Sequence, residues 1–230
     1  MKIAKLLIII FVGGVVIVYL LYQITLGPEV MMNQAIVRAV RVNPEPPESA
    51  VLNVPYTVQA PFAKWDAYDE DACEEAALLM AYEYIIGSEY IDGVIPHQQA
   101  QDELKQMIDF QVSEFDYKIE TDLYEEETKL FVESYWPGYS TRVIETSIEA
   151  IKKEIVLNNP VVIPATAEIL NNPHYHYPDY HMLTIIGYSE DSFITNDPGT
   201  KHGEDWKYNQ IIIIEAIENS GGVPVVLEKK

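Results

Sequence analysis

The sequence predicts an α+β fold, with helices in the N-terminal half of one domain and strands in its C-terminal half, preceded by one N-terminal transmembrane helix. Three observations lead to this expectation. Stretches of helix-forming residues fall between residues 73 and 135, short apolar runs bounded by turn residues follow from residue 139, and residues 6–21 carry no charge. Helices first and strands later are typical of α+β proteins rather than of alternating βαβ units.

Composition excludes several classes of protein. The chain has 230 residues, of which 48% are hydrophobic, so it is not a disordered chain. Its 15 basic and 36 acidic side chains give a net charge of -21, which argues against a nucleic-acid partner and against binding to anionic lipid through a basic patch. The length fits one domain with an appendage.

Residues 1–27 are expected to be a transmembrane signal-anchor. The apolar run continues to about residue 26, near the roughly 20 residues that span a bilayer core. Lys2 and Lys5 are the only charges before Glu29, so the rest of the chain is expected outside the cytoplasm of a single-pass cell-membrane protein. The alternative is a cleaved signal peptide and a secreted protein, although this run is longer than the usual apolar core of about 7–15 residues.

Residues 28–50 are rich in proline and are expected to form a spacer, and residues 51–230 form the domain. Residues 51–58 are expected to be extended. The helix at 73–86 is expected to start at an N-cap of Asp69 or Asp71 and to stop at Gly87. Further helices are expected at 97–113, 121–135 and 147–157, and strands at 139–145, 160–165, 181–188, 192–196 and 223–227, with 211–217 undecided.

Cys73 is the only cysteine, so it forms no intramolecular disulfide and no multi-cysteine metal site. It stands where an acidic stretch turns into a helix. A thiol at a helix N-terminus is favoured as thiolate by the helix dipole. A nucleophilic cysteine then needs an imidazole to hold its proton and an acceptor to orient that imidazole.

His181 and Asp197 are the candidates for these two roles. His181 opens one expected strand and Asp197 ends the next, so a hairpin would bring them side by side. Gln59, at the end of the extended segment, is the candidate to donate its amide N–H to an oxyanion, together with the backbone N–H of Cys73.

Four segments carry a resemblance to a known family. They are VPYTVQAP at 54–61, DACEEAA at 71–77, YHMLTIIGY at 180–188 and FITNDPGT at 193–200. Their order is similar to that of papain-like cysteine peptidases, and more specifically of the bacterial peptidase C-39-like domains, relatives of the double-glycine leader peptidases that process bacteriocins. The resemblance covers residues 51 to 227.

The resemblance implies a papain-like fold and a peptide or protein substrate, without a metal or organic cofactor. It implies Cys73 as nucleophile, His181 as general base and acid, Asp197 as the residue that orients it, and Gln59 as oxyanion donor. Gln59 lies further before the cysteine than is usual in papain-like enzymes, so the segment between them should form an extra loop. Glu74 and Glu75 also depart from the small residues common at these positions. Nearby carboxylates raise the pKa of a thiol, against the helix dipole.

Several other side chains are candidates for metal binding or for contact with substrate. His174, His176 and His181 with Asp179 resemble a zinc set, but a solvent-exposed loop beside the cleft is the expectation. Acidic residues at 69–71 are expected to be solvated, and those at 74–75 to stabilise the first helical turn. Trp65 and Tyr180 are the candidate substrate-binding residues, while Tyr175 and Tyr177 are expected to pack or contact substrate.

The sequence thus predicts a membrane-anchored, extracytoplasmic cysteine peptidase that hydrolyses peptide bonds through a thioester. Two alternatives remain open. One is an amidase or transpeptidase of the NlpC-like kind that acts on peptidoglycan stem peptides. The other is a peptide-binding module whose triad is inactive, because folds outlive activities.

Overall fold

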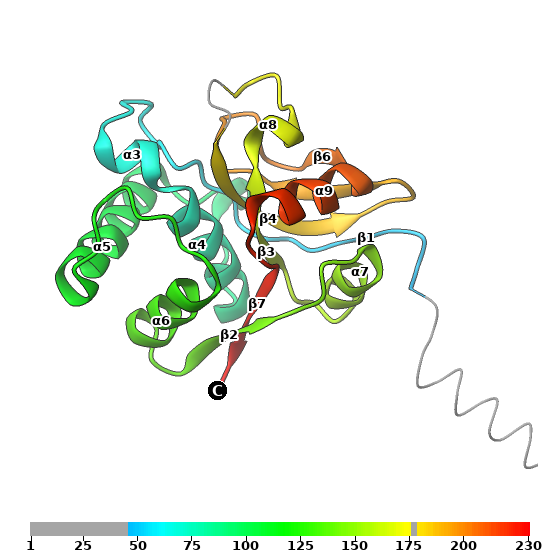
Figure 1. Ribbon diagram of the computed structural model, residues 1–230, viewed down its shortest axis with the longest axis horizontal. Helices are drawn as coiled ribbons and strands as arrows, with labels where there is room; N and C mark the ends of the chain where they lie inside the picture. The colour runs from blue at the N-terminus through cyan, green and yellow to red at the C-terminus, as the bar shows by residue number, and fades with distance from the viewer. Residues whose placement is uncertain (1–45, 176–178) are drawn as a thin grey trace, which may run out of the picture. The chain divides into compact units, whose positions relative to one another are not determined.

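The computed structural model describes residues 46–175 and 179–230, and its residues from Pro46 onward form one compact unit. A group of helices lies beside a sheet (Figure 1). The helical group contains α3 (Ala67–Asp71), α4 (Cys73–Ile86), the 3-10 helix η1 (Ile91–Gly93), α5 (His97–Phe115) and α6 (Glu125–Tyr135). Three helices accompany the sheet, namely α7 (Ile148–Val156), α8 (Ala167–Leu170) and α9 (Gln210–Ser220).

The expected transmembrane segment, residues 1–27, lies outside the described residues, as does the spacer up to residue 45. Within the two described ranges, every helix is too short or too polar to cross a bilayer.

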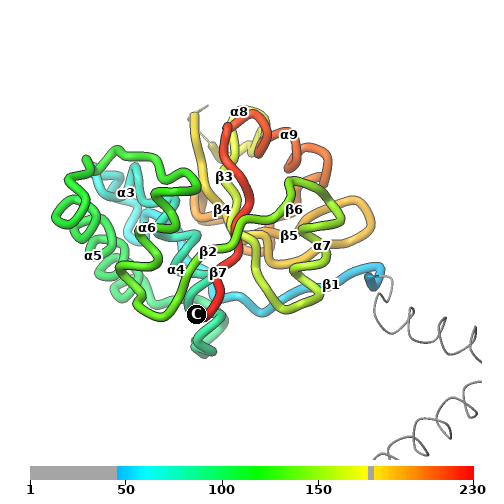
Figure 2. The backbone as a smooth tube through the Cα atoms, turned by 60° about the horizontal axis from the view of Figure 1, so that its bottom comes forward, coloured from blue at the N-terminus to red at the C-terminus, as the bar shows by residue number. Residues whose placement is uncertain are grey.

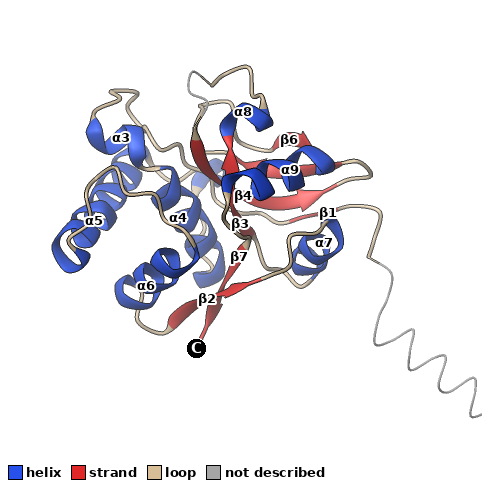
Figure 3. Cartoon of the chain, in the orientation of Figure 1, coloured by secondary structure: helices blue, strands red, loops and turns tan. Residues whose placement is uncertain are grey.

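The sheet is antiparallel throughout the described ranges. Its order is β2-β7-β3-β4-β5-β6, and β1 pairs with the far end of β4. Figure 3 shows these strands in red with helices around them. The strands are β1 (Ala50–Val51), β2 (Tyr139–Val143), β3 (Val161–Thr166), β4 (Tyr180–Tyr188), β5 (Ser192–Asn196), β6 (Trp206–Asn209) and β7 (Val225–Lys229).

Helices cover both faces of the central strands, as Figure 2 shows, with α4 to α6 on one side and α7 and α9 on the other. Alternate residues of a strand point to opposite faces. Accordingly, Val161 and Ile163 of β3 belong to the core under α7 and α9, whereas Val162 belongs to the core under α4, α5 and α6. The sheet therefore separates two hydrophobic cores, which explains why β3 and β4 are apolar at almost every position.

Helix α4 is buried on nearly all sides. Residues 76–81 are six consecutive buried positions, and the backbone carbonyl of Ala77 accepts a hydrogen bond from the Thr184 hydroxyl of β4 at 2.9 Å. A helix that is apolar all round belongs in a core. It ends at Gly87 in the left-handed conformation, φ 77°, which glycine adopts without the steric cost of a Cβ. This packing fixes the position of Cys73, its first residue.

Within the described ranges, the element predictions were right for most residues. The helix at 73–86 and the strand at 192–196 are confirmed to the residue, and the undecided segment 211–217 is helical in α9. The N-cap prediction was wrong, because Ala72 precedes α4 without a side-chain cap, while Asp69 and Asp71 belong to the short helix α3, capped by Asp66. The extended segment 51–58 is strand only at its first residue, and η1, α8 and β6 were not expected.

Candidate active site

A pocket of about 520 Å³ opens at the N-terminal end of α4. Five of the six predicted site residues line it, and they come from four segments of the chain. These residues are Gln59, Trp65, Cys73, Tyr180 and His181. The sixth, Asp197, lies behind His181 and is fully buried.

His181 and Asp197 form a buried pair. The Nε2 atom of His181 lies 2.9 Å from Oδ1 of Asp197, and both side chains are 0% exposed. The pair forms because β4 and β5 are antiparallel neighbours, with Thr184 opposite Asn196, so the start of β4 meets the turn after β5. This is the hairpin that the sequence predicted.

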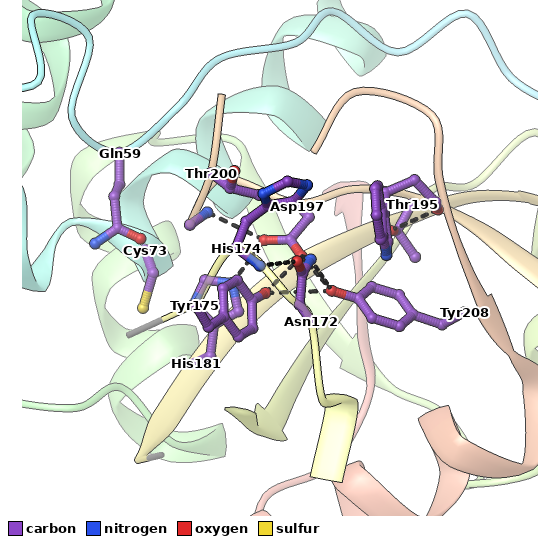
Figure 4. Close-up of polar contacts among 12 residues, drawn as sticks. Gln59, Cys73, Asn172, His174, Tyr175, His181, Thr195, Asp197, Thr200 and Tyr208 are labelled. Atoms are coloured by element: carbon purple, nitrogen blue, oxygen red, sulfur yellow. Dashed lines mark hydrogen bonds and ion pairs between the residues drawn. The ribbon is translucent and has the colours of Figure 1, made fainter. Parts of the chain in front are cut away.

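The carboxylate of Asp197 is surrounded by donors (Figure 4). Its Oδ2 accepts hydrogen bonds from the hydroxyls of Tyr175 and, at 2.6 Å, Tyr208, and a longer one from Asn172. Its Oδ1 also accepts the backbone N–H of Gly199 at 3.1 Å. We call Tyr175, Tyr208, Asn172 and the Gly199 N–H the aspartate cage.

The cage keeps Asp197 ionised. Burial alone raises the pKa of a carboxyl group, but the positive charge of protonated His181 and the hydrogen bonds from His181, Tyr175 and Tyr208 outweigh it, so the pKa of Asp197 lies below its ordinary value. Burial and the charge of Asp197 in turn raise the pKa of the Tyr208 hydroxyl, which therefore stays a donor. Asp197 is thus held as an acceptor toward the imidazole.

The turn that follows Asp197 is fixed by two close approaches. The Tyr56 hydroxyl donates to the carbonyl oxygen of Thr200 at 2.6 Å and to that of Asp197 at 3.2 Å. A Cβ added at Gly203 would lie 1.9 Å from the Asp197 carbonyl oxygen, so only glycine fits there without moving the aspartate.

Cys73 has a different electrostatic environment from the one that a free helix terminus would give. Its thiol donates a hydrogen bond to Oε2 of Glu74 at 2.9 Å. A single residue, Ala72, separates the end of α3 from the start of α4. Burial, followed by the charge of Glu74, raises the pKa of Cys73 well above its ordinary value. The described conformation therefore holds Cys73 as a thiol.

Glu74 and Glu75 stand in the first turn of α4, as expected, and both are buried, which the sequence did not predict. Oε1 of Glu74 accepts the backbone N–H of Leu123 at 3.2 Å, and Gln111 donates to Oε1 of Glu75. Burial and the charge of Glu75 raise the pKa of Glu74, and burial also raises the pKa of Glu75. Asp69, which was expected to be solvated, is buried, and its carboxylate accepts a hydrogen bond from the Trp65 N–H.

Gln59 is buried, but its amide is turned away from the orientation of an oxyanion donor. The Nε2 atom donates to the carbonyl oxygens of Asp69 at 2.9 Å and Glu70 at 3.1 Å. Its Oε1 has no hydrogen-bond partner among the residues that the structure describes, and Figure 4 shows this oxygen on the side of Cys73. The role of Gln59 as an oxyanion donor stays a prediction that requires the amide to rotate.

The predicted substrate-binding residues lie at the rim. Trp65 is 43% exposed, with a left-handed backbone at φ 50°. Tyr180 is half-buried and donates its hydroxyl to the Leu123 carbonyl at 2.8 Å. The ring of His174 packs on that of His202, with centroids 4.5 Å apart. His176 of the considered zinc set lies outside the described residues.

Sequence reasoning missed the aspartate cage and the Cys73–Glu74 contact. Tyr208 and Asn172 carry no motif, and β6 was not expected, so nothing in the sequence placed them near Asp197. The sequence indicated that Glu74 raises the pKa of the thiol. It did not indicate that Glu74 is buried, because this burial follows from the packing of α5 and α6 on α4.

The comparisons with known proteins agree with this fold. Residues 51–220 match the model of the Peptidase_C39 like family, so the chain belongs to that family. Among solved structures, it is similar to one described as a "putative C39-like peptidase" from Bacillus anthracis, with 17% identity and a TM-score of 0.54. The match covers 80% of this chain and 99% of that one, and at this identity it shows the fold alone. No curated protein matches the chain.

Replacing Tyr208 with Phe should make stability more sensitive to acid. Because the pKa of Asp197 is lowered in the folded state, its contribution is present above the unfolded value of about 3.9 and is lost as the pH falls through the lower folded value. Loss of one hydroxyl donor raises that folded pKa. We expect a free energy of unfolding lower by about 1.5–3 kcal/mol at pH 7, with a smaller difference below about pH 4.

Urea unfolding between pH 7 and 3 measures this effect. Tyr188→Phe is the matched control, because the Tyr188 hydroxyl donates to the Pro47 carbonyl instead of a carboxylate. Its difference from the wild type should not change with pH. A pH-independent difference for Tyr208→Phe would contradict the role given to the cage.

Replacing Glu74 with Gln should speed alkylation of Cys73. Removal of the charge lowers the pKa of the thiol, and the thiolate fraction at a fixed pH below that pKa rises about tenfold per unit. We expect iodoacetamide to modify the variant at least about threefold faster at pH 7. Glu83→Gln changes a buried acid further along the same helix and should leave the rate unchanged. A slower or unchanged rate for Glu74→Gln would show that Glu74 does not restrain the thiol.

Proposed function

We propose that this protein is a cysteine peptidase, with Cys73 as nucleophile, His181 as general base and acid, and Asp197 as the residue that orients His181. The observation that carries the proposal is the buried His181–Asp197 pair at 2.9 Å, whose imidazole lines the same pocket as Cys73, the only thiol of the sequence. Membership of the Peptidase_C39 like family supports it.

The reaction is acyl transfer in two steps. His181 takes the thiol proton, and the thiolate of Cys73 attacks the peptide carbonyl carbon. Since Nε2 of His181 faces Asp197, Nδ1 is the nitrogen that would exchange the proton. The imidazolium then protonates the leaving amine, and water hydrolyses the thioester with His181 as base.

Two features of the described conformation must change when substrate binds. The thiol of Cys73 must exchange its hydrogen bond to Glu74 for one to His181, which then takes the proton. The Gln59 amide must also turn if its N–H is to stabilise the oxyanion together with the Cys73 N–H. Catalytic hydrogen bonds often reach their final geometry only in the complex with substrate. Substrate-dependent activation of Cys73 is therefore part of the proposal.

The first test is turnover. The full chain is incubated with a peptide mixture, and products are identified by mass spectrometry. We expect hydrolysis by the wild type and a loss of at least about a thousandfold in Cys73→Ala and His181→Ala, because thiol and imidazole act as one unit. His97→Ala, a histidine at the start of α5, should retain activity. Cleavage that survives Cys73→Ala would reject the mechanism.

Two related functions are distinguished by the same experiment. Peptidoglycan stem peptides are included as substrates, since an NlpC-like amidase uses the same triad. A non-catalytic peptide-binding module is favoured by one observation, the raised pKa of the Cys73 thiol bound to Glu74. It predicts peptide binding without cleavage in the wild type, and binding that persists in Cys73→Ala.

We further propose that residues 1–27 anchor the domain in the cell membrane with the domain extracytoplasmic. The support is the uncharged run at 6–21 after Lys2 and Lys5. Fractionation of bacterial cells that express the full chain should leave it in the membrane pellet after a high-salt wash, and a variant without residues 2–27 should be soluble. Recovery of a shorter, released chain would favour signal cleavage, and an intact soluble full chain would reject both.

A further inference from the structure

The pocket beside Cys73 is bordered by carboxylates from three separate segments. Glu70 and Asp71 stand at the end of α3, Asp122 lies in the segment before α6, and Asp179 directly precedes β4. Among the described residues, the pocket lining contains no lysine or arginine. The histidines His174 and His181 are its basic side chains.

These four carboxylates are not neutralised by the part of the chain that the structure describes. The ion pairs of lysine and arginine found there involve other acids, namely Glu133, Glu154 and Glu228. Burial and then the charges of neighbouring acids, first Glu120 and Asp122, raise the pKa of Asp71. Burial and the charge of Asp179 raise the pKa of Asp122. The carboxylates therefore repel one another and would be stabilised by a cation.

A second, independent observation points to a ligand that donates hydrogen bonds. Oε1 of Gln59 is a buried acceptor without a hydrogen-bond partner among residues 46–175 and 179–230, on a side chain that lines the pocket and is 1% exposed. Its amide oxygen is on the Cys73 side in Figure 4, because Nε2 is held by two carbonyl oxygens on the other side. Buried polar atoms are nearly always satisfied, so this acceptor is suited to an N–H group from a bound molecule.

We propose that this pocket binds a positively charged group of the substrate next to the scissile bond, so that the peptidase selects cationic peptides. That the bound peptide is a substrate rests on the proposed function. The preference for a positive charge rests on the pocket alone. A volume of about 520 Å³ accommodates a long side chain, and the open rim leaves room for the peptide.

An ammonium or guanidinium group would lie among Asp71, Asp122 and Asp179, while an N–H of the peptide reaches Gln59. Two sources supply such a charge, a Lys or Arg side chain and the free amino terminus of a short peptide. An acidic peptide would be repelled by the carboxylates of these three segments.

Binding to the full chain with Cys73→Ala tests the proposal without cleavage. Isothermal titration uses acetylated, amidated tetra-alanine as the neutral peptide, the same peptide with Lys or Glu at each position in turn, and unacetylated tetra-alanine amide. We expect Lys at one position, or the free amino terminus, to bind roughly tenfold tighter than the neutral peptide, and Glu to bind more weakly. The acetylated and unacetylated arms identify the source of the charge.

A matched pair of triple variants locates the effect. Asp71→Asn, Asp122→Asn and Asp179→Asn together remove three charges from the pocket and should reduce the preference to within about twofold. The control removes three charges at exposed positions outside the pocket, through Glu114→Gln, Glu190→Gln and Glu218→Gln, and should keep the preference. Equal loss in both would mean that net charge, not the pocket, selects the peptide.

The outcomes separate this inference from the proposed function. Charge-selective binding without any hydrolysis by the wild type keeps the pocket assignment and rejects the peptidase. Hydrolysis without a charge preference keeps the peptidase and rejects the pocket assignment. No binding by any peptide, or equal binding by all of them, overturns the inference.

Discussion

The structure around the candidate site depends on the buried carboxylate of Asp197. A charge without solvent is stable only when other groups satisfy it, and here the donors come from two strands, a turn and a loop. His181 of β4 and Tyr208 of β6 are donors that belong to the sheet, so the aspartate, which follows β5, joins β4, β5 and β6 at one end. The imidazole of His181 takes its orientation from this arrangement, and the pocket wall follows from it.

On the opposite side of the pocket, the buried carboxylates lie beside a thiol instead of beside an imidazole. Helix α4 brings Cys73 next to Glu74 and Glu75 in a core without a compensating cation among its described neighbours. One wall thus holds an oriented imidazole beside an ionised carboxylate, whereas the other favours a neutral thiol. The difference between the two walls makes the protonation state of Cys73 sensitive to what occupies the space between them.

Much of this could be predicted from the sequence, for identifiable reasons. Helix α4 was located by a run of helix formers with a glycine stop, and the His181–Asp197 contact followed from two strands joined as a hairpin. The predictions that were wrong concern burial. Asp69 was expected in solvent but is buried, and the burial of Glu74 and Glu75 was not predicted. Their partners, Gln101, Gln111 and the Leu123 N–H, come from α5 and from the segment before α6. The donors around Asp197, such as Tyr208 and Asn172, approach through tertiary packing, which leaves no local pattern in the sequence.

The restrained thiol also bears on the chemical durability of the protein. Peroxides attack the thiolate and convert it through sulfenic acid to products that are not reversed, so susceptibility follows thiolate character and exposure. Cys73 is 6% exposed and bonded to Glu74, and the chain offers no second cysteine with which an oxidised sulfur could form a recoverable disulfide. Keeping the resting sulfur protonated therefore protects the one group in this chain that oxidation would permanently remove.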